Sequence, residues 1–148
     1  MDLQLPDDFK EFLKLLNSHG VEYLLIGGYA VGCHGYPRAT GDLDIWIAID
    51  PQNADRLVAV FREFGFAVSG LNRDLFLEPG SMVRIGNPPI RIEIITDISG
   101  AEFENCYPNR VRMELDGIPI DVINMDDLRS NKRASGRPKD MDDLKNLP

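Results

Sequence analysis

An alternating stretch at residues 42–49 constrains the fold of this chain more than any other segment. Every second residue is apolar, which is the period of a β-strand that buries one face. The opposite face begins with two carboxylates, Asp42 and Asp44. Because such a strand must bury its apolar side against other elements, it requires a layered fold around a hydrophobic core. The apolar members of the alternation are Leu43, Ile45, Ile47 and Ile49.

The rest of the chain predicts helices and strands in mixed order, which indicates the α/β (α+β) class. Apolar residues at helical spacing predict helices, and short apolar or alternating runs between glycines and prolines predict strands. Asp116-Gly117 is typical of a hairpin turn, and Gly86-Asn87-Pro88-Pro89 separates another strand pair. The predicted helices are 7–19 and 51–64, with 29–33 as a further helical candidate, and the remaining predicted strands are 21–26, 81–85, 90–96, 110–115 and 118–123, while 70–80 is irregular.

The chain has 148 residues, which fits a single domain spanning 1–148. We expect its last part, 124–148, to form a C-terminal helical extension. Asn124 or Asp126 is suited to cap a helix at the start of this part, and the stretch from Gly136 to Pro138 interrupts it.

Charge and composition limit the kinds of binding partner and the cellular compartment that we expect for this protein. The formal net charge of −8 argues against broad, non-specific binding of nucleic acid. An anionic substrate therefore requires bound cations or a local basic patch. No apolar stretch reaches the roughly 20 residues of a membrane helix, and no signal peptide is visible. The two cysteines fit no zinc spacing, so we expect free thiols in a cytoplasmic protein that has no membrane partner.

The carboxylates predict a site for a divalent cation. Asp42 and Asp44, two residues apart on a strand, point to one side, and their mutual repulsion favours a bound cation. Glu93 lies between two isoleucines on a second predicted strand, and Asp97 at the end of that strand is an alternative ligand. Hard oxygen ligands suit Mg²⁺ or Mn²⁺. Three carboxylates from adjacent strands can build a two-metal site of the kind used in phosphoryl and nucleotidyl transfer.

Other residues are candidates for binding phosphate. Gly27-Gly28 follows the predicted strand 21–26, where backbone N–H groups can approach an anion. Arg38 lies in the loop that precedes Asp42. We expect it either to contact phosphate or to hold that loop in place. Lys132 and Arg137 belong to a basic tail that either reaches a phosphate or pairs with nearby aspartates. These aspartates are Asp140, Asp142 and Asp143.

Two further side chains near the carboxylates keep alternative roles. His34 lies just beyond Gly27-Gly28. Its predicted role is either that of a catalytic base or that of a local hydrogen-bonding group. Trp46 lies on the aspartate face of its strand, where it either stacks on a base or packs in the core.

The arrangement resembles the polymerase-beta-like nucleotidyltransferase superfamily. Ile26-Gly27-Gly28, thirteen intervening residues and Asp42-Leu43-Asp44-Ile45 are similar to its motif. Two further segments resemble the small bacterial and archaeal members of this superfamily. The first precedes Asp42 and reads Gly35-Tyr36-Pro37-Arg38-Ala39-Thr40. The second is the tail Lys132-Arg133-Ala134-Ser135-Gly136-Arg137-Pro138-Lys139-Asp140, followed by Asp143-Leu144. These members include minimal nucleotidyltransferases and abortive-infection type toxins.

The resemblance implies a fold, a mixed central sheet with helices packed on it. It also implies a set of site residues and a nucleotidyl transfer reaction. Asp42 and Asp44 would be the metal pair, and Glu93 the third ligand and a candidate base. Gly27 and Gly28 would line the triphosphate. The implied reaction moves a nucleoside monophosphate from an NTP to a hydroxyl of an RNA 3′ end such as a tRNA, of a protein or of a small molecule. A toxin–antitoxin setting, with an antitoxin or a helical partner protein, is implied in the same way.

Two departures from the family pattern leave other functions open. Many members carry Ser where this chain has Gly28, and Asp where it has Glu93. A non-catalytic module that binds nucleotide, or a module that binds a partner protein, is therefore the alternative to the enzyme.

Overall fold

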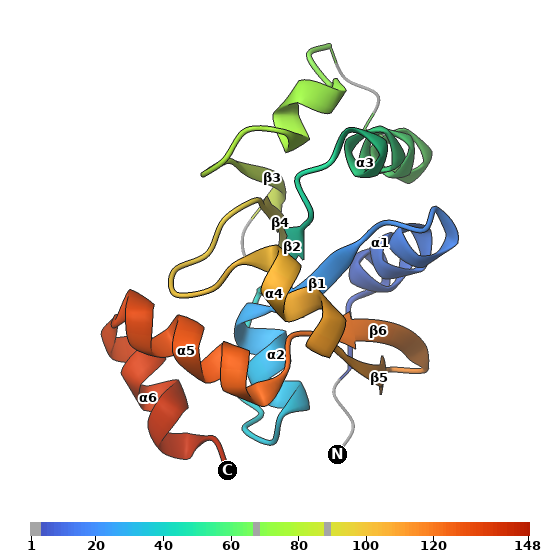
Figure 1. Ribbon diagram of the computed structural model, residues 1–148. Helices are drawn as coiled ribbons and strands as arrows, with labels where there is room; N and C mark the ends of the chain where they lie inside the picture. Colours follow the sequence, from blue (N-terminus) through green and yellow to red (C-terminus); the bar gives the residue numbers. More distant parts are fainter. Residues whose placement is uncertain (1–3, 67–68, 88–89) are drawn as a thin grey trace.

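The computed structural model describes residues 4–148 except 67–68 and 88–89. The described residues form one domain in which a six-stranded mixed sheet separates two groups of helices (Figure 1). This arrangement confirms the predicted fold class and the mixed central sheet. Within these residues, no helix is both long enough and apolar enough to cross a membrane.

The sheet places strands next to one another that are far apart in the sequence. Its order is β3-β4-β2-β1-β6-β5. The β2–β4 and β1–β6 pairs are parallel, and the β1–β2, β3–β4 and β5–β6 pairs are antiparallel. The strands are β1 (Tyr23–Ile26), β2 (Asp42–Ile47), β3 (Met82–Asn87), β4 (Ile90–Ile95), β5 (Val111–Leu115) and β6 (Ile118–Val122).

Helices cover both faces of the sheet. On one side α1 and α3 lie next to each other, and on the other side lie α2, α4 and the C-terminal pair α5 and α6 (Figure 1). The helices are α1 (Asp7–Ser18), α2 (Gly27–Cys33), α3 (Pro51–Phe64), α4 (Phe103–Cys106), α5 (Met125–Ser135) and α6 (Pro138–Asn146), with short 3₁₀ helices η1 (Arg73–Phe76) and η2 (Tyr107–Asn109).

Local sequence signals account for both ends of α3 and for the start of α5. The Asp50 side chain accepts the N–H of Asn53 at 3.0 Å and caps α3, which begins at Pro51 and ends at Gly65 with φ +104°. Of the two predicted caps for α5, the structure uses Asn124, whose side chain accepts the N–H of Asp127 at 2.9 Å.

The structure differs from the predicted elements in several places. Helix α2 begins at Gly27, ahead of the predicted 29–33, and β2 ends at Ile47 instead of residue 49. Strand β3 continues past residue 85, and Gly86 within it has φ +94° and stands where a Cβ would lie 2.8 Å from the carbonyl oxygen of Ile90. Pro88 and Pro89 of the predicted turn lie outside the described residues. The stretch 70–80, predicted to be irregular, contains η1. Helix α4 has only four residues, too few for a helical period to appear in the sequence.

The alternating strand lies at the centre of the core. Leu43, Ile45 and Ile47 are fully buried, as the alternation predicts. The prediction was wrong for Ile49, which lies beyond the end of β2 and is 36% exposed. Trp46 on the opposite face is also buried, because α4 covers that end of the strand. Its ring meets Phe103 edge to face at 5.2 Å, and its Nε1 donates to the Thr96 carbonyl at 3.2 Å. Trp46 is therefore a core residue, and the alternative of stacking on a base is excluded in this fold.

A buried asparagine fixes α3 to the ends of β1 and β2. The Asn53 side chain accepts the N–H of Glu22 at 2.8 Å and donates to the carbonyls of Glu22 and Ala48 at 3.1 and 3.0 Å. These three backbone groups lie where the two strands separate. Because buried polar groups cost free energy when unpaired, Asn53 stabilises this junction.

We expect Asn53→Ala to lower the free energy of unfolding by about 1–3 kcal/mol, because it leaves buried backbone groups without partners. Gln52→Ala, at an exposed position of the same helical turn, is the matched control and should change it little. Urea unfolding followed by circular dichroism measures both. Equal losses in the two variants would contradict this role for Asn53.

Candidate functional site

The parallel pairing of β2 with β4 brings the three predicted carboxylates together. In the register of this pair, Asp44 lies opposite Glu93 and Asp42 lies opposite Arg91. Residues opposite each other in a ladder point to the same face. Asp42, Asp44 and Glu93 therefore share one face of two adjacent strands. Asp97, the alternative ligand, is exposed and accepts the N–H of Gly80 at 2.5 Å.

Strand β1, on the other side of β2, brings the glycine pair to the same place. Ile26 lies opposite Asp44, so Gly27 follows directly beside the Asp44 carboxylate. Gly27 has φ +71°, and a Cβ there would collide with the carboxylate, 3.0 Å from Asp44 Cγ. Only glycine fits this position, since it tolerates the left-handed backbone and leaves the space empty.

Packing also explains why Gly28 stands where many family members have Ser. A Cβ at Gly28 would lie 2.8 Å from Thr40 Cβ, 2.7 Å from Thr40 Oγ1 and 3.2 Å from Arg38 Nη1. The loop before β2 approaches the start of α2 closely at this point. In this chain the Thr40 hydroxyl and the Arg38 guanidinium occupy the space beside the glycine pair.

Asp44 has an unusual electrostatic environment. Its Oδ1 is buried and has no hydrogen-bond donor among the described residues. Burial, followed by the hydrogen bond with Glu93, the repulsion of Glu93 and that of Asp42, raises the pKa of Asp44 well above that of an ordinary aspartate, while Lys139 acts in the opposite direction. A buried carboxylate oxygen without a donor is suited to a cation.

Two arginines that the sequence reasoning missed pair with the other carboxylates. Arg91 on β4 donates from Nε and Nη2 to the two oxygens of Asp42 at 3.2 and 3.3 Å. Arg84 on β3 donates from Nε to Glu93 Oε1 at 3.0 Å. The sequence carried a signal for Arg91, which shares the β4 face with Glu93. The contribution of Arg84 depends on β3 pairing with β4.

The carboxylates offer the oxygen ligands that suit a divalent cation. Asp44 offers a free oxygen, and the missing side chain of Gly27 leaves space beside it. In this conformation, no three His, Cys, Asp or Glu side chains of the described residues are placed to hold one metal ion together. The arginine partners of Asp42 and Glu93 explain this, because they direct carboxylate oxygens to guanidinium groups.

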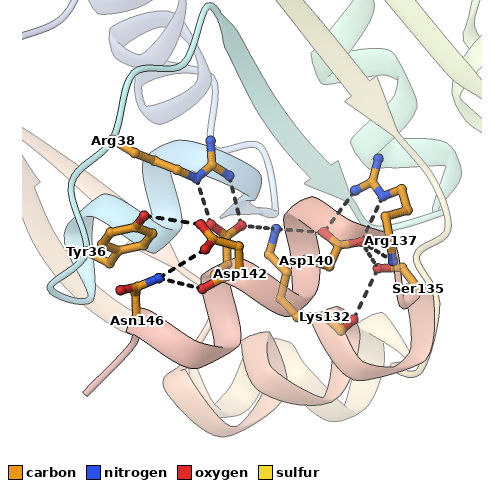
Figure 2. Close-up of polar contacts among 9 residues, drawn as sticks. Tyr36, Arg38, Lys132, Ser135, Arg137, Asp140, Asp142 and Asn146 are labelled. Atoms are coloured by element: carbon orange, nitrogen blue, oxygen red, sulfur yellow. Dashed lines mark hydrogen bonds and ion pairs between the residues drawn. The ribbon is translucent and has the colours of Figure 1, made fainter.

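Lys132, predicted to reach a phosphate, is enclosed by the C-terminal helices. Its side chain is 3% exposed, and its Nζ lies 3.2 Å from Asp140 Oδ1 and 3.0 Å from Asp143 Oδ2 (Figure 2). Both aspartates are fully buried. The structure thus uses Lys132 to neutralise two buried carboxylates, the pairing that the sequence kept as the alternative.

Arg38 holds the loop before β2, the structural one of its two predicted roles, and contact with phosphate stays a prediction. Its Nε and Nη2 donate to Asp143 at 2.7 and 2.9 Å, which ties the loop before β2 to α6. Its Nη1 lies next to Gly28, 3.2 Å from the place that a Cβ would take there. Arg38 therefore holds the loop and also directs one nitrogen towards the glycine pair.

Arg137 lies at the edge of this network. It donates from Nε and Nη2 to Asp140 at 2.8 and 3.2 Å, and its side chain is 67% exposed. Its pKa is raised mainly by the hydrogen bond with Asp140 and, among weaker causes, by Asp44. Of the predicted basic residues, Arg137 has the most exposed side chain, although its guanidinium is paired with Asp140.

Charge pairing keeps the buried aspartates ionised. Burial alone would raise the pKa of Asp140 and of Asp143. Hydrogen bonds from Arg137, Ser135 and Lys132 outweigh burial at Asp140, and those from Arg38 and Lys132 do so at Asp143, so both pKa values lie below the usual range. The resulting stability is fully present above the ordinary aspartate pKa and is lost as acid protonates these groups.

His34 has a local structural role in this fold. Its Nε2 lies 2.6 Å from the carbonyl oxygen of Ile123, at the end of β6. This contact joins the end of α2 to the segment that leads into α5, as the hydrogen-bonding alternative predicts.

We expect Lys132→Met to lower the free energy of unfolding by about 3–5 kcal/mol, because it leaves two buried carboxylates without their shared cation. Lys145→Met removes the same charge from an exposed position of α6 and should have little effect. Thermal and urea unfolding at neutral pH measure the difference. Similar stability of the two variants would show that the network does not hold the C-terminal helices.

We expect Gly27→Ala to destabilise the fold more than Gly117→Ala. Both glycines have positive φ, +71° and +80°, and share a strain cost of about 1–2 kcal/mol. Only Gly27 meets the Asp44 carboxylate, which adds about 1–3 kcal/mol of overpacking. Gly117 has no atom of the described residues within 4 Å of its ideal Cβ. Equal losses in urea unfolding would contradict the close contact between Gly27 and Asp44.

Known structures of low sequence identity share the fold. A candidate nucleotidyltransferase from Thermotoga maritima superimposes with a TM-score of 0.61 at 18% identity over 93% of this chain and 88% of its own. An antigenic nucleotidyltransferase-like protein from Paracoccidioides brasiliensis superimposes with a TM-score of 0.54 at 18% identity over 95% of this chain and 72% of its own. No curated protein matches the chain in sequence.

The sequence also matches a family model over nearly its whole length. The family is described as a nucleotidyl transferase of unknown function, DUF2204, and its model covers residues 6–148. The match includes the glycine pair, all three carboxylates and the C-terminal helices. The chain therefore belongs to this nucleotidyl transferase family.

Proposed function

We propose that this protein transfers a nucleoside monophosphate from an NTP to a hydroxyl acceptor and releases pyrophosphate, with Mg²⁺ or Mn²⁺ as cofactor. The observation that carries the proposal is the meeting of Asp42, Asp44 and Glu93 on paired strands, beside a glycine that leaves space at Asp44. The buried Asp44 oxygen that lacks a donor among the described residues supports it further. Family membership supports the reaction class.

The three carboxylates are the proposed metal ligands. Divalent cations held there would neutralise the triphosphate and lower the pKa of the attacking hydroxyl. Asp42 and Asp44 are the proposed metal pair, and Glu93 is the third ligand and the candidate acceptor of the hydroxyl proton. The strands hold these side chains in place, as reactions that depend on positioning require.

The phosphate contacts are proposed for the residues around the start of α2. Gly27 and Gly28 allow the triphosphate to approach the backbone, and Arg38 Nη1 lies beside them. Arg137 is 67% exposed, and we assign it a contact with the γ-phosphate as part of this proposal. For Lys132 we propose a positioning role, since its contacts with Asp143 and Asp140 hold the partners of Arg38 and Arg137.

The acceptor is an RNA 3′ end such as that of a tRNA, a protein side chain or a small molecule. The family resemblance extends the proposal to a cytoplasmic toxin of a toxin–antitoxin pair, whose activity an antitoxin or a helical partner protein controls. These settings share one reaction, so a single assay with labelled NTP and several acceptors covers them.

A second candidate function is a nucleotide-binding module without catalysis. The arginine partners of Asp42 and Glu93 favour it, because they neutralise the site without metal. This candidate predicts nucleotide binding that does not depend on metal and that persists in Asp42→Asn.

Metal-dependent transfer of label from α-³²P-NTPs to total RNA and to host proteins tests the proposal. We expect Asp42→Asn/Asp44→Asn to lower the rate by at least about 100-fold, since metal ligands are lost. Asp55→Asn/Asp74→Asn removes two exposed carboxylates outside the site and is the matched control. No transfer by the wild-type protein would contradict the enzyme, and transfer that survives without metal or in the site variant would contradict the metal role of the carboxylates. Metal-independent nucleotide binding in the site variant would favour the module.

A further inference from the structure

Arginines lie beside two of the three carboxylates on the face formed by β2, β3 and β4. Arg91 stands opposite Asp42 in the β2–β4 ladder, and Arg84 stands opposite Glu93 in the β3–β4 ladder. Arg91 Nη2 also lies 4.0 Å from Glu93 Oε1. The two guanidinium groups therefore offset most of the negative charge on this face.

The guanidinium groups engage the oxygens that a metal ion would need. Both oxygens of Asp42 accept hydrogen bonds from Arg91, and Glu93 Oε1 accepts one from Arg84. In contrast, Asp44 Oδ1 has no donor among the described residues. A cation can therefore approach Asp44 Oδ1 without displacing a hydrogen-bond donor. At Asp42 and Glu93 it must compete with an arginine side chain for the carboxylate oxygens.

Both arginine side chains are exposed enough for a cation to replace them at the carboxylates. The Arg84 side chain is 56% exposed on edge strand β3, and that of Arg91 is 29% exposed. Arg91 can turn into solvent and leave only the partly exposed Asp42, which is 34% exposed. Arg84 can turn away from the buried Glu93 because Arg91 Nη2 remains 4.0 Å from the same carboxylate oxygen. Lys132, which is 3% exposed between two buried aspartates, cannot do so. The fold therefore contains one fixed network of charge pairs and one that a competing ion can open.

We propose that Arg91 and Arg84 are internal counter-ions that hold Asp42 and Glu93 in place before metal binds, and that they set the metal affinity by competing with the divalent cation for these oxygens. The inference rests on the metal role of the carboxylates in the proposed function. It does not depend on which NTP or acceptor is used, or on turnover.

The chain offers a matched control for charge and strand geometry. Arg112 on β5 lies opposite Asp121 on β6, and its Nη1 donates to Asp121 Oδ1 at 3.0 Å. Its side chain is 62% exposed, similar to that of Arg84. Arg112→Gln therefore removes an equivalent cross-strand ion pair and the same net charge at the other end of the sheet.

Calorimetric titration with Mn²⁺ alone, without nucleotide, tests the inference. We expect Arg91→Gln to bind Mn²⁺ about threefold to tenfold more tightly than the wild-type protein, as the loss of a partly exposed charge pair predicts. Arg84→Gln should show a gain in the same direction. Arg112→Gln should change the affinity by less than about twofold, because its charge lies at the other end of the sheet, where screening weakens its effect on the cation.

Thermal unfolding separates competition from a purely structural role. In EDTA, Arg91→Gln should be less stable than the wild-type protein, because the carboxylates repel one another without their counter-ion. Saturating Mn²⁺ should then raise its melting temperature by more than it raises that of the wild type. A structural arginine would instead produce the same deficit with and without Mn²⁺.

The outcomes distinguish this inference from the proposed function. If wild-type Mn²⁺ binding is lost in Asp42→Asn/Asp44→Asn but Arg91→Gln binds no more tightly than Arg112→Gln, the counter-ion role is wrong and the metal site stands. If neither the wild-type protein nor Arg91→Gln nor Arg84→Gln binds Mn²⁺, both the counter-ion role and the metal role of the carboxylates are wrong.

Discussion

The parallel pairing of β2 with β4 is the interaction on which the rest of the site depends. It places Asp44 opposite Glu93 and carries Asp42 on the same face. A shift of one residue in this register would turn Glu93 to the opposite face. The buried residues Leu43 and Ile92 oppose such a shift, because it would bring their apolar side chains to the polar face. The hydrophobic core thus fixes the geometry of the charged face.

The C-terminal helices connect this core to the loop before β2 through charge. Asp143 is buried between Arg38 and Lys132, and Asp140 between Lys132 and Arg137. Because unpaired buried carboxylates are costly, α5, α6 and the loop are stable only as one assembly. This coupling places Arg38 Nη1 beside Gly28, which explains how a segment a hundred residues away in the sequence supports the glycine pair.

The two groups of charge pairs differ in what surrounds them. The pairs around Lys132 are enclosed, so they contribute to a fixed structure. The arginine side chains of the pairs formed by Arg84 and Arg91 are in partial contact with water, where an ion pair contributes little to stability. Under the proposed counter-ion role, the site would combine a rigid support with carboxylates whose arginine partners a cation can replace.

The sequence by itself determined the class of fold and the face of the carboxylates, because alternation and turn residues are local signals. The hairpin at Asp116-Gly117 and the alternation around Asp42 and Asp44 follow from backbone geometry within a few residues. Only the tertiary structure decided which charges meet. Arg84 reaches Glu93 through the pairing of β3 with β4, and Lys132 is enclosed rather than free because α6 folds back onto α5. Pairings of this kind depend on the arrangement of whole elements in space, and no local pattern encodes them.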